Sequence, residues 1–198
     1  MTSSAVEQPT LEQTRRRIFL ALFTALAVAL HTLEFLLPSP IPWFRFGFAN
    51  ILTLTALFLY GGRAAWSLTL LRVVIGSLLV GNLFSPGFLL SLTGGVLATA
   101  LMTGLQALLA PRVGPVGVSV VGAVGHATGQ LLVAWLLLVR HDGLWMIYPF
   151  LLLFSFLSGL ANGVAADLLI DFLRQQPAFQ SPDSSCAANS RTSSAETV

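Results

Sequence analysis

The chain has 198 residues, of which 55% are hydrophobic and only 9% are charged. A soluble domain carries about 25% charged residues because its surface must be wetted, so this composition excludes an ordinary soluble protein. The formal net charge is +2, but the arginines are dispersed along the chain, which argues against binding to nucleic acid. The sequence therefore predicts an integral membrane protein.

Six hydrophobic segments follow one another along the chain, separated by short breaks that carry Arg, Pro or Gly. A membrane-spanning helix needs about 20 mostly apolar residues, whereas barrel strands would alternate over about 10 residues. We expect an all-α polytopic fold with six transmembrane helices. In chain order the predicted helices cover residues 18–37, 46–60, 64–81, 88–110, 116–139 and 144–173. The second would span only about 22 Å, so it is either partly re-entrant or extended outward by Phe44 and Arg45.

The two ends of the chain are polar and rich in Ser, Thr, Ala and Pro. We therefore expect disordered tails over residues 1–14 and 175–198, flanking a single membrane domain over residues 15–174. The apolar segment behind the first arginines is too long for a cleaved signal peptide and fits a retained anchor.

The arginines in the breaks predict the orientation, because cytoplasmic loops carry an excess of basic residues. With the amino terminus inside, six arginines face the cytoplasm and two face outward. The six are Arg15, Arg16, Arg17, Arg63, Arg112 and Arg174, and the two are Arg45 and Arg140. We expect a multi-pass protein of a bacterial inner (plasma) membrane with both termini in the cytoplasm.

An arginine lies near the middle of the third predicted helix. Placing Arg72 there costs at least about 2.5–3.5 kcal/mol on insertion scales, so it needs a partner or water. It either locks two helices together through an ion pair or serves a ligand cavity. Glu34, which shares a face of the first helix with His31, can pair with Arg72 or with Arg45.

The fifth predicted helix carries His126 and Gln130 at i, i+4 spacing, interleaved with Gly125 and Gly129. Either the glycines admit another helix and the two polar side chains bond across that contact, or the polar face looks into a cavity. We predict a substrate-binding cavity with five polar residues: Glu34, Asn50, Arg72, His126 and Gln130. An arginine beside neutral groups suits an anionic or amide-bearing ligand, such as a vitamin-like or phosphorylated compound.

The first helix carries Ala21, Ala25 and Ala29 at four-residue spacing. Small residues so placed form a smooth stripe along which helices associate in lipid. The stripe either packs within this chain or docks a second membrane protein.

The sequence contains no GxxxxGK[ST] loop, GxSxG elbow, HExxH pair or Cys/His cluster, which argues against a nucleotide site, a hydrolase or a metalloenzyme. Its single cysteine, Cys186, lies in the carboxyl-terminal tail. The aspartates are Asp142, Asp167, Asp171 and Asp183. Because an enzyme acting on diphosphates needs grouped carboxylates to hold Mg²⁺, we expect no catalysis by this chain itself, and no metal or cofactor.

Four stretches together resemble the Gx transporter family, also labelled heptaprenyl diphosphate synthase component I. They are Gly47–Leu54, Leu71–Leu79, Phe84–Gly95 and Gly122–Gln130. The resemblance covers about residues 17–171. It extends more distantly to the six-helix substrate-binding (S) components of energy-coupling factor transporters, whose first helix contacts the coupling subunit through an AxxxA pattern. The resemblance implies an S-component-like fold and such a contact for Ala21, Ala25 and Ala29.

The favoured function is a membrane component that binds a small molecule and takes it up with a coupling subunit and an ATPase. The alternative is a membrane subunit associated with heptaprenyl diphosphate synthesis, bound to a separate catalytic synthase subunit. A third possibility is a structural scaffold for another membrane complex.

Overall fold

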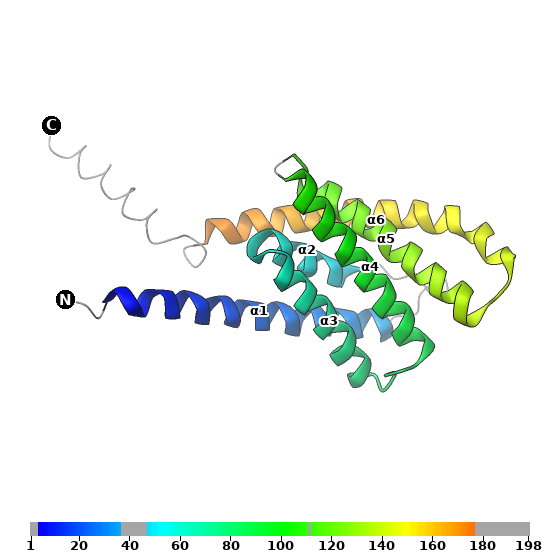
Figure 1. Cartoon of the computed structure of the whole chain (residues 1–198), viewed down its shortest axis with the longest axis horizontal. Helices are drawn as coiled ribbons and strands as arrows, with labels where there is room; N and C mark the ends of the chain where they lie inside the picture. The colour runs from blue at the N-terminus through cyan, green and yellow to red at the C-terminus, as the bar shows by residue number, and fades with distance from the viewer. Residues whose placement is uncertain (1–3, 37–46, 111, 177–198) are drawn as a thin grey trace.

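The computed structural model describes residues 4–36, 47–110 and 112–176. The described residues form six α-helices and two short helical turns, with no strand among them, so the predicted all-α fold is confirmed (Figure 1). The helices are α1 (Ser4–Leu36), α2 (Phe48–Tyr60), α3 (Gly62–Leu79), α4 (Pro86–Leu109), α5 (Pro115–Val133) and α6 (Tyr148–Gln175). Between α5 and α6 lie a π-helical turn, η1 (Ala134–Leu138), and a 3-10 turn, η2 (Asp142–Ile147).

Five helical segments of the described chain are long and apolar enough to cross a membrane by length and composition. They are Gln13–Glu34, Gly62–Leu79, Pro86–Leu109, Pro115–Leu138 and Asp142–Gln175. The remaining helix, α2, has only 13 residues and so extends about 20 Å. The predicted short second helix is therefore confirmed, and it is shorter than the sequence indicated.

The first helix begins earlier than the sequence predicted. α1 starts at Ser4, within the segment 1–14 that the sequence assigns to a disordered tail. Leu11, Glu12 and Gln13 are good helix formers that connect directly to the apolar part of α1, and extending an existing helix is far easier than starting one. Of the predicted tail over residues 175–198, only residues 175 and 176 are described.

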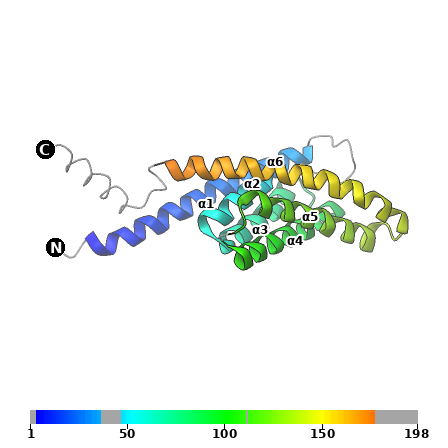
Figure 2. The ribbon, with the colours of Figure 1, turned by 90° about the horizontal axis from the view of Figure 1, so that it is seen from above.

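The start of α1 and the end of α6 lie at the same end of the bundle (Figures 1 and 2). The connection from α2 to α3 is also at this end, because Arg16 on α1 donates a hydrogen bond of 2.9 Å from Nη2 to the carbonyl oxygen of Tyr60. The guanidinium of Arg16 also lies 5.8 Å from the centre of the Tyr60 ring. We call this the basic end, since Arg63 and Arg174 adjoin it.

The shortest helix occupies the centre of the bundle. α2 contacts α1, α3, α4, α5 and α6, and seven of its 13 residues are buried. Its carboxyl-terminal half packs into an apolar core in which Leu54 and Leu57 meet Met102 of α4 and Val118 of α5. Because α2 is shorter than its neighbours, its amino-terminal end leaves space between them.

Glycines bring α6 close to α5. A Cβ added at Gly163 would lie 2.7 Å from the Cα of Val116, and one at Gly159 would lie 2.9 Å from the Cα of Val120. On the other side of α5, a Cβ at Gly129 would lie 3.0 Å from the carbonyl oxygen of Thr93 on α4. The GxxxG steps thus place α4, α5 and α6 in backbone contact, as small residues do in membranes.

We expect Gly163→Ala to destabilise the protein, because its new methyl group would press on backbone atoms that cannot rotate away. Overpacking of this kind costs about 1–3 kcal/mol. The midpoint of thermal unfolding in detergent measures the effect. Gly104→Ala on α4 is the matched control, since a Cβ there would meet no atom within 4 Å. Equal unfolding midpoints for the two variants would contradict the contact.

Candidate ligand-binding cavity

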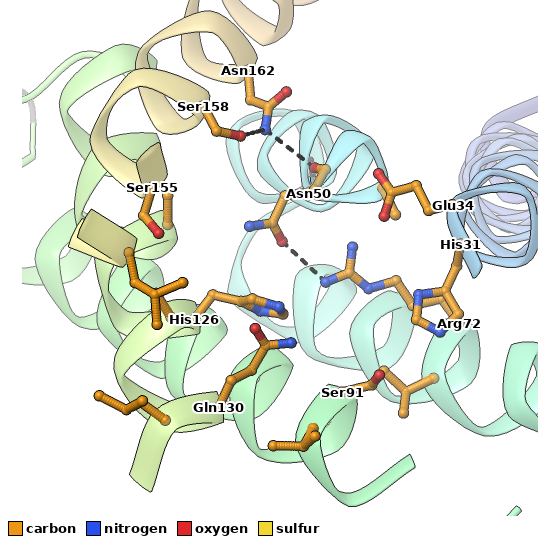
Figure 3. A pocket seen from close by; sticks show the side chains of 18 of the residues that line it. His31, Glu34, Asn50, Arg72, Ser91, His126, Gln130, Ser155, Ser158 and Asn162 are labelled. Atoms are coloured by element: carbon orange, nitrogen blue, oxygen red, sulfur yellow. Dashed lines mark hydrogen bonds between the residues drawn. The ribbon is translucent and has the colours of Figure 1, made fainter. Parts of the chain in front are cut away.

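A partly open cavity lies beyond the start of α2, in the half of the bundle remote from the basic end. All six helices contribute to its walls (Figure 3). The lining residues are His31, Glu34, Gly47, Ala49, Asn50, Arg72, Val73, Leu90, Ser91, Ala123, His126, Ala127, Gln130, Leu131, Ala134, Leu151, Ser155, Ser158 and Asn162. The five polar residues that the sequence proposed for a substrate cavity are all among them.

The cavity has a volume of about 70 Å³. A cavity needs roughly 10–15 Å³ to hold one water molecule, so this one has room for several waters or for a compact organic group. Its size in this state suits a small ligand.

Arg72 projects from α3 into the centre of this region (Figure 3) and is only 4% exposed. Its Nη2 donates a hydrogen bond of 3.0 Å to Oδ1 of Asn50 on α2. Its Nε is buried and has no hydrogen-bond partner in the described part of the chain. Glu34 is the acidic group that acts electrostatically on Arg72. The arginine therefore belongs to a polar network and still has donor capacity for a ligand.

Two side chains hold the start of α2 from opposite helices. Glu34 of α1 accepts a hydrogen bond through Oε1 from the backbone N–H of Phe48, and Asn162 of α6 donates through Nδ2 to the carbonyl oxygen of Gly47 at 3.3 Å. The backbone of Gly47 has a φ of 73°, which glycine adopts without strain. The first N–H groups of a helix have no partner within it and favour negative charge nearby. Glu34 therefore caps α2 as well as lining the cavity.

His126 and Gln130 of α5 lie at the contact with α4 and also line the cavity. A Cβ added at Gly94 of α4 would lie 2.9 Å from Cε1 of His126 and 2.9 Å from Cγ of Gln130, so both side chains pack directly on α4. Both also line the cavity, and the polar groups face the guanidinium of Arg72 from across it (Figure 3).

Several polar lining residues lie outside the five that the sequence predicted for the cavity, among them Ser91 of α4. Ser155, Ser158 and Asn162 lie on α6 at i, i+3 and i+7, a spacing that places them on one helical face. This face opens on the cavity, and Nδ2 of Asn162 also donates to Oγ of Ser158 at 3.3 Å. The spacing could have revealed these residues, but small hydroxyl side chains are common in membrane helices and give a weak signal.

The alanine stripe of α1 does not pack inside this chain. Ala21, Ala25 and Ala29 are exposed, whereas Ala27 on another face is completely buried. The three exposed alanines line an open groove between α1 and α3, which Arg16 and Arg63 border at the basic end.

The described residues contain no group of three or more His, Cys, Asp or Glu side chains that could hold a metal ion. The acidic residues of α6, Asp167 and Asp171, lie toward the basic end and do not line the cavity.

Six packed, mostly apolar helices around one cavity define an all-α polytopic membrane protein. The chain belongs to the family described as heptaprenyl diphosphate synthase component I, which matches residues 23–169. The match extends from within α1 to within α6 and so includes the whole cavity, and it confirms the resemblance to the Gx transporter family. No curated protein and no solved structure matches the chain.

We expect Glu34→Ala to destabilise the protein, because the start of α2 loses its hydrogen-bond acceptor. Loss of a helix cap costs about 0.5–2 kcal/mol. Glu34→Gln keeps an oxygen that can accept from Phe48, so it should lose clearly less stability. Thermal unfolding of the two variants beside the wild type measures the difference, and equal losses would show that the hydrogen bond is unimportant.

Proposed function

We propose that this chain is the membrane-embedded substrate-binding component of an uptake system. It captures a small molecule in the cavity beyond α2 and releases it toward the cytoplasm when an ATP-hydrolysing partner acts on it. The observation that supports this most is that polar side chains from all six helices line the same cavity. Polar groups inside a membrane domain are costly, and their usual place is a substrate or ion path.

The arginines support an orientation with the basic end in the cytoplasm. Four arginines lie where α1 meets the connection from α2 to α3, namely Arg15, Arg16, Arg17 and Arg63. Arg140 lies beyond the carboxyl-terminal end of α5. Arg45 lies outside the described residues. Under the positive-inside rule both termini are cytoplasmic and the cavity lies in the outer half of the bacterial inner membrane.

The open groove between α1 and α3 supports docking of a membrane coupling subunit. Its exposed alanines let another helix approach closely, and close packing is what drives association in lipid. The resemblance to S components gives the same role to these positions. The ATPase would then reach this chain through the coupling subunit.

A second function remains a candidate because of the family description. The chain would then be a membrane subunit that accompanies a separate heptaprenyl diphosphate synthase. In that case the same groove would bind the synthase, and the cavity would have no transported ligand.

Affinity purification separates the two functions. We expect a tagged chain to recover a membrane subunit with an ATPase, and Ala25→Leu to lose them, because the larger side chain fills the groove. Leu26→Phe is the matched control, since Leu26 is exposed outside the groove. Recovery of a prenyl diphosphate synthase without an ATPase would instead support the synthase-associated function.

Retention of a ligand tests the cavity directly. We expect native mass spectrometry of the detergent-purified protein to show a bound small molecule, and Gln130→Leu to lower its occupancy about tenfold through loss of a buried hydrogen bond. Gln106→Leu makes the same exchange on α4 outside the cavity and should leave the occupancy unchanged. Equal loss in both variants, or no bound molecule in the wild type, would count against the binding function.

A further inference from the structure

The charges around the cavity restrict the chemistry of its ligand. The described residues that line it include one arginine, Arg72, and one carboxylate, Glu34. The remaining polar groups in the lining are hydroxyls, amides and two imidazoles. The Glu34 carboxylate accepts from the first N–H of α2. A helix amino terminus carries roughly half a positive charge, which offsets much of the charge of Glu34. Part of the charge of Arg72, on which Glu34 also acts, therefore remains available to a ligand.

Arg72 also has hydrogen-bond donors to spare. A guanidinium has five N–H groups, and Nη2 bonds to Asn50 while the buried Nε has no partner in the described part of the chain. A buried donor without an acceptor is unfavourable. Nε and the second N–H of Nη2, the one not bonded to Asn50, can present two parallel N–H bonds. This geometry matches the two oxygens of a carboxylate.

Asn50 fixes the guanidinium from one side, and His126 and Gln130 face it across the cavity (Figure 3). A carboxylate bound there by Arg72 would lie near the imidazole of His126 and the amide of Gln130. Those side chains can contribute further hydrogen bonds without adding another fixed charge.

One part of the cavity wall, at the carboxyl end of α5 and the facing turns of α4 and α6, is apolar. Leu90, Leu131 and Ala134 line it and are buried, and Leu151 of α6 completes it. The same residues pack in one hydrophobic cluster with Trp135 and Tyr148. The part of the ligand that lies against this wall is therefore hydrocarbon or aromatic.

A single arginine matches one negative charge. A phosphate monoester carries a charge of about −1.5 to −2 at neutral pH, and a diphosphate ester carries more. Such groups need several cations, whereas the described lining has one arginine and a carboxylate beside it. Phosphorylated and diphosphorylated compounds, including prenyl diphosphates, fit this cavity poorly.

We propose that the ligand is a small monocarboxylic acid with an apolar body, whose carboxylate binds Arg72 on the side that faces His126 and Gln130. The proposal rests on the binding function and names the substrate class of the same cavity.

Three probes share a phenyl ring and differ in their polar head group: benzoate, benzamide and phenyl phosphate. Their relative affinities test which head group the cavity prefers. We expect isothermal titration of the full-length protein in detergent at pH 7 to show benzoate binding at least about tenfold more tightly than the other two, because only benzoate offers a single charge to Arg72. Tighter or equal binding of phenyl phosphate or benzamide, or no binding of benzoate, would overturn the carboxylate assignment. The native mass spectrum of the retained molecule tests the binding function independently of these probes.

Two variants test the role of Arg72. We expect Arg72→Gln to weaken benzoate binding at least about tenfold through loss of a charged hydrogen bond. If that variant does not fold, Asn50→Asp serves in its place, because it keeps the size of the side chain and puts a competing carboxylate beside the guanidinium. It should weaken benzoate binding at least about tenfold more than it weakens benzamide binding, because benzamide carries no charge. Unchanged benzoate affinity in either folded variant would overturn the assignment of Arg72.

Discussion

The hydrogen bond between the Glu34 carboxylate and the N–H of Phe48 holds the start of α2 inside the bundle. A helix of 13 residues extends about 20 Å, against a hydrocarbon thickness of about 30 Å. Its first N–H groups have no partners within the helix, so other parts of the protein must satisfy them. Glu34 from α1 and Asn162 from α6, which binds the carbonyl of Gly47, supply this support. The polar groups that stabilise the short helix are then in place to line the space it leaves.

Arg72 depends on the same arrangement. Asn50 lies in the first turn of α2 and accepts a hydrogen bond from the guanidinium, so the position of α2 determines where the charge of Arg72 lies. Structural and binding roles are coupled in these residues. A change in Glu34 or Asn50 should therefore affect both folding and ligand affinity, whereas Gln130, farther from α2, offers a cleaner separation of the two.

Much of this arrangement follows from the sequence. The scarcity of charge and the runs of apolar residues predicted the helices, the cost of an arginine in lipid indicated Arg72, and the i, i+4 spacing of His126 and Gln130 indicated a polar face on the fifth helix. The central place of α2 could not be predicted, because residues that face lipid and residues that face other helices are equally apolar. The capping role of Glu34 depends on a contact between α1 and α2 that no local pattern encodes. The early start of α1 and the π-helical turn after α5 are likewise set by neighbouring turns of helix rather than by composition.

The glycine contacts between α5 and α6 also determine which parts of the bundle can move. Where a Cβ would strike the backbone of a neighbouring helix, as at Gly159 and Gly163, no rotamer change can make room for sliding. These contacts therefore resist sliding of α4, α5 and α6 past one another. Widening of the cavity for a ligand to pass would then involve displacement of α1 and α2, and a protein bound to the exposed side of α1 would act directly on that displacement.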